Sequence, residues 1–466
     1  MSTKVNQIAL YSFILLLCIF AWLVVITPIH LSGVLYYNWI CDIACLFISI
    51  LAIIVLNVKG KCDILSVPFF VGVIYIIMFF ITPLYDLFIG EISIFDAFDL
   101  FDYGIQGSLY ALIGFIAFCL IYANKVHPYQ ARPYLQFSSA VKRKIENTAI
   151  ILWAIEFVVG IICVILTQGF SVSYILSFGM LGDSNAYETS SSLLGFIVQF
   201  TRGIVPLSLI IFAVSSRKQL LISVCFLTAM FEVISGFRYM IVIMICGFFY
   251  FQYLSKNKKV PIFTIILLAL GLSFVVGIVG FTRGSVRSGV GFTSQGFGAD
   301  DVVDAVLGNF RIYKSYYAVI KAVPSMTPYL YFDQMLIYTM IMAIPRAIWP
   351  NKPLNPGTDA QLYGMGEVAV KSGYAYPNLG EYYYSFGVLG VIFFMGLFGW
   401  WLAKITNKYR YRPNTILDVA QYCILVPLTL QLLIRGYTPS NFYLIIALVF
   451  PFWFLRRYVL KNNSNY

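Results

Sequence analysis

The feature that most constrains this chain is a series of apolar runs, each about 20 residues long, that recurs along nearly its whole length. A run of this length is what an α-helix needs to cross the hydrocarbon core of a bilayer. Of the 466 residues, 60% are hydrophobic and only 11% are charged. Soluble domains carry about 25% charged residues. The sequence therefore predicts an all-α polytopic integral membrane protein and excludes a water-soluble fold.

The apolar runs predict about 12 transmembrane helices in one membrane domain, residues 1–466. The expected spans are residues 7–27, 35–57, 64–83, 105–124, 147–167, 192–214, 219–236, 239–254, 260–282, 386–403, 415–434 and 440–456. The first run is longer than a signal-peptide core and lacks a clear cleavage site, so we expect a retained span. Residues 283–385 then form one long loop between the ninth and tenth spans.

The charged residues in the turns give the expected orientation. Lysine and arginine concentrate in the even-numbered turns and the C-terminal tail, for example at Lys59, Lys61, Lys142, Arg143, Lys144, Lys256, Lys258, Lys404 and Arg410. The third turn, residues 84–104, carries five carboxylates and no cation. The positive-inside rule then places both termini in the cytoplasm and the 283–385 loop outside. It also explains most of the net charge of +11, which leaves little reason to expect nucleic-acid binding.

Two segments of the long loop have helical patterns of their own. Residues 300–322 combine an apolar stripe with cations at Arg311, Lys314 and Lys321, which predicts an amphipathic helix on the outer membrane surface. Those cations suit either lipid headgroups or a substrate. Gln334 to Trp349 is apolar but short for a span, so we expect a re-entrant or interface-lying helix.

Several arginines lie where the positive-inside rule does not put them. Arg202 falls near the middle of the sixth span, where a charge must face a cavity or a partner. The others are at span edges or in the loop: Arg238, Arg283, Arg346 and Arg435. Guanidinium groups bind phosphate oxygens bidentately, so the group is a candidate site for a lipid diphosphate. The alternative is pairing with Glu156, Glu232 or a loop carboxylate.

Aromatic residues mark the second half of the loop. Tyrosine offers a flat apolar face and a hydroxyl, which suit sugar rings. The candidates for sugar binding are Tyr374, Tyr376, Tyr382 and Tyr383. The alternative is an aromatic belt at the membrane interface. The nine cysteines and two histidines show no metal-ligand spacing, so no metal site and no disulfide framework are expected.

These features together resemble a known family. The resemblance rests on about a dozen spans, one long outer loop late in the chain, residues 235–238, Arg435, and the runs 344–353 (IPRAIWPNKP) and 373–387 (GYAYPNLGEYYYSFG). In these respects the chain is similar to the bacterial Wzy-type oligosaccharide repeat-unit polymerases of O-antigen and capsule synthesis.

The resemblance implies a membrane glycosyltransferase-like fold and a reaction on the outer face of the bacterial plasma (inner) membrane. Such polymerases transfer a growing glycan from one polyprenyl diphosphate onto a repeat unit held on another. The implied partners are polyprenyl-diphosphate-linked oligosaccharides, membrane lipids and a chain-length regulator protein. The resemblance implies no cofactor, no metal and no nucleotide sugar.

The residues agree with that chemistry. Arginines stabilise the charge that develops on a leaving diphosphate. A carboxylate would accept the proton of the acceptor hydroxyl, with Glu381 the first candidate for this base and Asp359 and Glu367 the next. Glu381 lies close to where the loop re-enters the membrane, as the diphosphate must. Its structural alternative is helix capping or pairing with a nearby arginine.

Other functions remain open at this point. A glycan ligase would share the membrane plan and the donor, but would use a different acceptor. A lipid-linked oligosaccharide flippase or other transporter usually shows two related halves, and no such repeat is visible. A pure scaffold would leave the intramembrane Arg202 unexplained.

Overall fold

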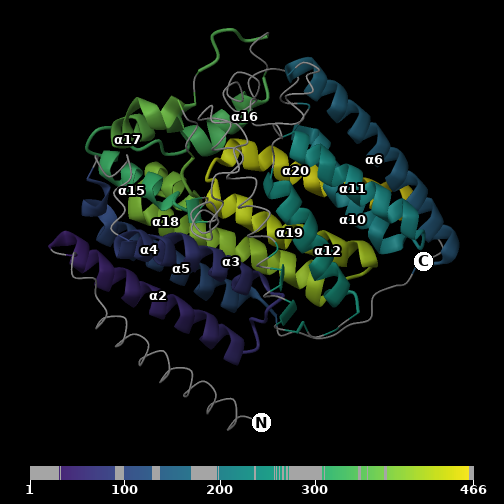
Figure 1. The fold of residues 1–466 in the computed structure, drawn as a ribbon, viewed down its shortest axis with the longest axis horizontal. Helices are drawn as coiled ribbons and strands as arrows, with labels where there is room; N and C mark the ends of the chain where they lie inside the picture. Colours follow the sequence, from purple (N-terminus) through teal and green to yellow (C-terminus); the bar gives the residue numbers. More distant parts are fainter. Residues whose placement is uncertain are drawn as a thin grey trace, which may run out of the picture.

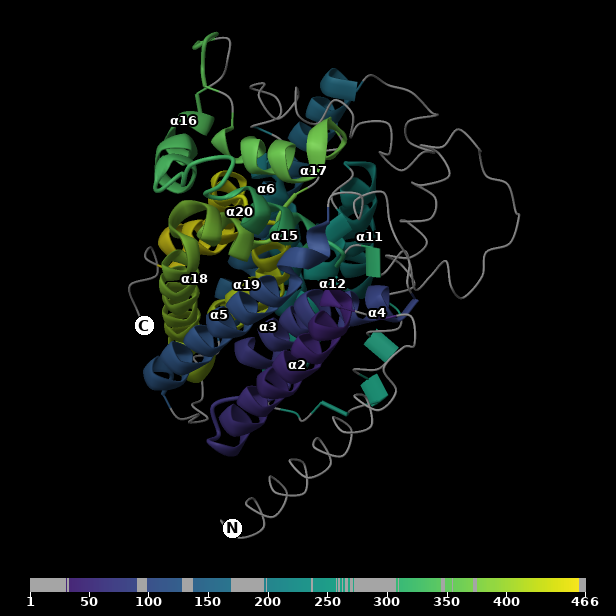
Figure 2. The same cartoon turned by 90° about the vertical axis from the view of Figure 1, so that its left-hand side faces the viewer.

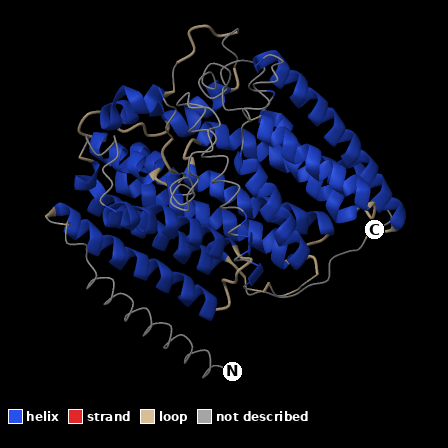
Figure 3. Cartoon of the chain, in the orientation of Figure 1, coloured by secondary structure: helices blue, strands red, loops and turns tan. Residues whose placement is uncertain are grey.

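The structure, a computed structural model, describes residues 33–89, 99–127, 137–168, 199–235, 238–256, 310–344, 348–353, 355–371 and 375–460, besides isolated residues at 31, at 197 and between 258 and 308. Within these ranges the chain forms helices and connecting segments with no strand (Figures 1 and 3). The predicted all-helical membrane class is confirmed.

Seven helical stretches in the described ranges are long and apolar enough to cross a membrane. They are α2 (Val34–Val58), α3 with α4 (Val67–Ile89), α5 with its preceding turn (Leu100–Lys125), most of α6 (Ser139–Gln168), α18 with its π-helical end (Asn378–Tyr411), α19 (Ile416–Ile434), and α20 (Thr438–Leu455) with the π-helical residues up to Tyr458. Each coincides with a predicted span.

Three further helices correspond to the sixth, seventh and eighth predicted spans and are shorter. They are α10 (Ile204–Val214), which follows the 3₁₀ turn η5 (Thr201–Gly203), α11 (Lys218–Ile234) and α12 (Arg238–Leu254). The predicted spans at 7–27 and 260–282 lie wholly or almost wholly outside the described residues. The total of about 12 spans therefore stays a prediction.

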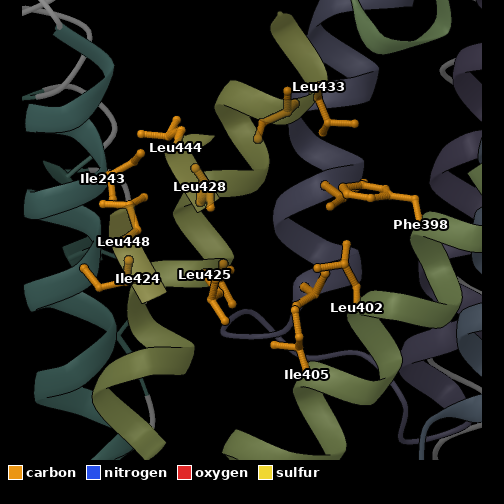
Figure 4. Packing of buried hydrophobic residues seen from close by; sticks show 14 of the residues in the cluster. Ile243, Phe398, Leu402, Ile405, Ile424, Leu425, Leu428, Leu433, Leu444 and Leu448 are labelled. Carbon is orange, nitrogen blue, oxygen red and sulfur yellow. The ribbon is translucent and has the colours of Figure 1, made fainter. Parts of the chain in front are cut away.

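Helix α19 lies at the centre of the packed helices. Its apolar residues contact α12 and α20 on one side and α18 on the other, and Figure 4 shows Ile424 and Leu425 among the side chains of this core. Helices α2 and α6 lie on opposite flanks (Figure 1). Burial of many apolar side chains between helices fixes their relative positions, since packed interiors leave few voids.

Helix α18 (Asn378–Ile405) has a kink where the chain enters its predicted span. Phe386 and Gly387 have non-helical backbone angles, and Gly387 has a φ of 61°, a conformation that glycine adopts without strain. The expected span began at residue 386, which is where the kink lies. The turns before it, residues 378–385, carry Glu381.

One end of the bundle is covered by short helices from the long loop. They are α15 (Tyr313–Ala322), η6 (Asp333–Tyr338), α16 (Thr339–Met342), η7 (Pro356–Thr358) and α17 (Asp359–Lys371). Figure 2 shows α16 and α17 at this end, beyond the first turns of α18. The described helices of Gln334–Trp349 are too short to span a bilayer, and α16 packs on α20, which agrees with the expected non-spanning segment.

The prediction of a surface helix at 300–322 is wrong for the part that the structure describes. Almost every residue of α15 is buried, including Lys314, which is 2% exposed. Arg311 and Lys314 instead pair with Asp86 at the end of α4 (Thr82–Ile89), at 2.9 and 3.5 Å. Asp86, from the predicted acidic turn, therefore forms ion pairs with Arg311 and Lys314. Helix α15 lies inside the protein and not on the membrane surface.

Candidate functional site

The candidate site begins with the buried carboxylate of Glu381, in the first turns of α18. Its side chain is 2% exposed. Thr438 donates to it from the backbone N–H, at 3.0 Å to Oε1, and from the hydroxyl, at 2.6 Å to Oε2. Gln334 donates from Nε2 to Oε1 at 3.0 Å. Both oxygens thus accept hydrogen bonds, which is what a buried carboxylate requires.

Gln334 extends this network to the loop. Its side-chain oxygen accepts a hydrogen bond of 2.8 Å from the hydroxyl of Tyr376. Burial raises the pKa of Tyr376 well above its usual value, and the charge of Glu381 adds to the effect, so the phenol stays protonated and donates. Gly357 in η7 packs directly on this hydrogen bond, and a Cβ there would collide with both side chains. Gly357 of the long loop therefore covers the hydrogen bond between Tyr376 and Gln334.

The α19–α20 junction, residues 435–438, is docked on the same region. The Gly436 N–H donates to the Tyr376 carbonyl at 2.8 Å. The Gly436 Cα lies against the backbone of Pro377 and Asn378, where no Cβ would fit. With the two hydrogen bonds from Thr438 to Glu381, these contacts fix the junction to the start of α18.

Arg435 occupies the first position of that junction. Asn441 donates to its carbonyl at 2.6 Å, which holds its backbone at the end of α19. Its side chain is exposed and makes no ion pair with any residue that the structure describes. A rigid backbone with an unpaired guanidinium can bind an external anion.

Arg202, unlike Arg435, is buried and forms an ion pair within the described part of the chain. It is fully buried, and its Nη1 lies 2.5 Å from Oε2 of Glu232 and 3.0 Å from the Ser235 hydroxyl. The alternative stated for Arg202, pairing with Glu232, is confirmed by this contact. Tyr239 interacts electrostatically with this pair and also with Arg435, so the two arginines belong to one neighbourhood at this end of the bundle.

The other predicted carboxylates lie in α17. Asp359 begins this helix, two residues after Gly357, and its side chain is exposed and near Tyr384. No ion pair connects Asp359 to the described part of the chain. Glu367 lies further along α17, but its side chain lies outside the described residues.

The side chains of the three remaining predicted arginines lie outside the described residues. Arg238 is the first residue of α12, near Tyr239, but its side chain is outside the described set. Arg283 and Arg346 also lie outside the described residues.

The four tyrosines predicted to bind sugars are spread over several environments. Tyr376 is buried in the network around Glu381. Tyr382 stacks on Phe394 at 5.2 Å, and Tyr383, 7% exposed, stacks on Tyr110 at 5.6 Å. Tyr374 lies outside the described residues.

Sequence reasoning missed three members of the site: Gln334, Thr438 and Gly436. Gln334 was treated only as the start of an apolar segment, and Thr438 and Gly436 as parts of a turn between spans. The sequence does carry a weak signal for the last two, since Arg435-Gly436-Tyr437-Thr438-Pro439 is a polar, glycine-containing junction between apolar runs. In the described ranges, no group of three or more His, Cys, Asp or Glu side chains is placed to hold a metal ion.

Comparison with protein families gives a match over almost the whole sequence. A family model described as O-antigen polysaccharide polymerase Wzy matches residues 9–463, nearly the whole chain. Neither a curated protein nor a solved structure is matched by the chain.

Proposed function

We propose a donor, an acceptor and a mechanism for this chain, which belongs to the O-antigen polysaccharide polymerase Wzy family. The donor is a glycan on a polyprenyl diphosphate, and the acceptor is a lipid-linked oligosaccharide repeat unit at the outer face of the plasma membrane. The observation that supports this most is Arg435, an exposed cation on a junction fixed to the buried Glu381.

In this proposal Arg435 contacts the diphosphate of the donor. The acceptor hydroxyl oxygen attacks the anomeric carbon, and the bond from that carbon to the diphosphate oxygen breaks. Negative charge develops on the leaving polyprenyl diphosphate, and the guanidinium of Arg435, carried on a held backbone, stabilises it. Arg202 has its charge compensated by Glu232 and supports the site from within.

The two carboxylates then have separate roles. Both oxygens of Glu381 are engaged by Thr438 and Gln334, so this side chain positions the junction that carries Arg435. Asp359 is exposed and free of ion pairs with the described residues, and it accepts the proton of the acceptor hydroxyl. This reverses the order expected from the sequence, where Glu381 came first as base.

The proposed arrangement in the membrane follows the charge pattern. The chain has about 12 spans, its termini are cytoplasmic, and residues 283–385 lie outside as one long loop. A chain-length regulator protein is the proposed protein partner, and the proposed sugar contact near Glu381 is Tyr382, which is half-buried. A ligase would use the same donor and the same arginine, but it would add no repeat units.

The glycan pool on the polyprenyl carrier tests the proposal. Cells that lack this protein should accumulate single repeat units on the outer face of the membrane and contain no polymer. Restoring the protein should restore products whose lengths rise in steps of one repeat. Polymer of normal length in the absence of the protein contradicts a polymerase. Single repeats confined to the inner face indicate a flippase, and full-length glycan retained on the carrier indicates a ligase.

A further inference from the structure

A second site lies at the opposite end of the bundle from Arg435. A cavity of about 510 Å³ is lined by residues near the start of α6 and α19 and near the end of α10 and α12. The other ends of three of these helices carry the arginines described above, since Arg202 precedes α10, Arg238 begins α12 and Arg435 follows α19. The cavity is therefore separated from the candidate active site by the length of the helices.

Two lysines supply the charge of this cavity. Lys142 on α6 is half-buried and Lys256, just after α12, is exposed, and neither makes an ion pair in the described part of the chain. The nearby carboxylates on α6 and α19 are already engaged. Glu146 accepts from Ser215 at 2.7 Å and faces Arg217, and Asp418 pairs with Arg456 at 2.7 Å. Among the described residues, the positive charge of the cavity is thus uncompensated.

The cavity wall combines polar side chains, among them Gln252 and Ser255, with three aromatic rings. Phe137, Phe212 and Phe251 line it, and the rings of Phe212 and Phe251 meet edge to face with centroids 6.0 Å apart. A small inorganic anion would satisfy the lysines but leave the three rings without contacts. A ligand with both a phosphate and apolar carbons satisfies both, and the volume lies in the usual range for small-molecule sites.

We propose that this cavity binds the headgroup of an anionic membrane phospholipid. Lys142 and Lys256 contact the phosphate, and the three phenylalanines contact the glycerol and the first acyl carbons. Basic pockets between transmembrane helices bind such headgroups in other membrane proteins. The surrounding end of the bundle is rich in lysine and arginine, as expected for the side that faces an anionic leaflet.

Lipid retention by the purified full-length protein tests this site. The protein in detergent micelles is titrated with phosphatidylglycerol, phosphatidylcholine or inorganic phosphate, and bound lipid is counted by native mass spectrometry. Phosphatidylglycerol should be retained over phosphatidylcholine. The double variant Lys142→Ala/Lys256→Ala should bind it roughly 30-fold more weakly. The matched control, Lys218→Ala/Lys258→Ala, removes two exposed lysines outside the cavity and should bind as the unchanged protein does.

The conservative variant Lys142→Arg/Lys256→Arg keeps both charges and should keep the lipid, which separates charge loss from misfolding. Equal retention of phosphatidylcholine, or equal loss in both alanine pairs, would overturn the proposal. Full displacement of phosphatidylglycerol by inorganic phosphate would also overturn it, since that result identifies a free-phosphate site. None of these outcomes affects the proposed polymerase activity at the other end.

Discussion

At the scale of single residues, the environment of Glu381 decides its role. The sequence predicted Glu381 just before the start of a span, and the structure places it in the first turns of α18, before the kink. The sequence could not show that Gln334 and Thr438 would engage both oxygens, since amide and hydroxyl side chains carry no periodic signal. Which carboxylate is left exposed to a substrate therefore depends on the folded structure.

Thr438→Val tests the positioning role of Glu381. The change removes the 2.6 Å hydroxyl bond and leaves a buried carboxylate with one fewer donor. A lost bond of this kind costs about 1–3 kcal/mol in the free energy of unfolding. We expect a lower thermal midpoint and a higher KM for the donor, because the junction bearing Arg435 loosens. Thr438→Ser keeps the hydroxyl and should restore both, whereas a Val variant with normal stability and KM would argue against the clamp.

Asp359→Asn tests the proposed base. Asp359 is exposed and outside the buried network, so the variant should fold normally. Loss of a general base typically lowers turnover by about 10²–10⁴-fold, with donor binding preserved. Turnover of purified protein on lipid-linked repeat units, with donor binding measured in parallel, separates the two effects. Normal turnover in Asp359→Asn would return Glu381 to first place as the base.

At the scale of elements, the sequence located helices well and their surroundings poorly. The stripe along 300–322 predicted a helix, and α15 is one over its described residues. Helical periodicity shows which side chains share a face, but it does not show what covers the polar face. In the fold, Asp86 pairs with the polar face of α15. Asp86 and Arg311 are 225 positions apart along the chain, so a local sequence pattern could not predict this pairing.

Asp86→Asn tests this anchoring of α15. Asp86 is 3% exposed and accepts hydrogen bonds from Arg311 and Tyr313. Removing one partner of a buried ion pair destabilises by about 3–5 kcal/mol. We expect a marked fall in the thermal midpoint of the purified protein. Asp102→Asn, an exposed carboxylate nearby in sequence, should change it little. Equal midpoints for the two variants would contradict the anchoring.

Gly436→Ala tests the docking of the α19–α20 junction on α18. The added Cβ would collide with the backbone of Pro377 and Asn378, which cannot rotate away as a side chain can. Overpacking of this kind costs about 1–3 kcal/mol, and activity should fall with stability. Gly396→Ala is the matched control, because its Cβ would meet only Ile121, at 3.5 Å. If both variants behaved alike, the junction would not depend on this close approach.

At the scale of the whole molecule, seven of the predicted spans coincide with membrane-length helices in the part of the chain that the structure describes. Hydrophobic length is a local property, so the sequence predicts it well. The packing of α19 between α12, α20 and α18 is a long-range property that no single run reveals. The same holds for the site, which joins three regions separated along the chain: the loop helix η6, the start of α18 and the α19–α20 junction.

In the proposed reaction Arg435, held on this junction, binds the diphosphate of the donor. The most direct measurement is the glycan ladder of cells that lack the native protein and carry Arg435→Ala or Arg435→Lys. With equal amounts of each protein in the membrane, Arg435→Ala should yield single repeat units with little or no polymer. Arg435→Lys keeps the charge without the bidentate fork and should give an intermediate ladder. A ladder of normal length and intensity from Arg435→Ala would contradict the claim.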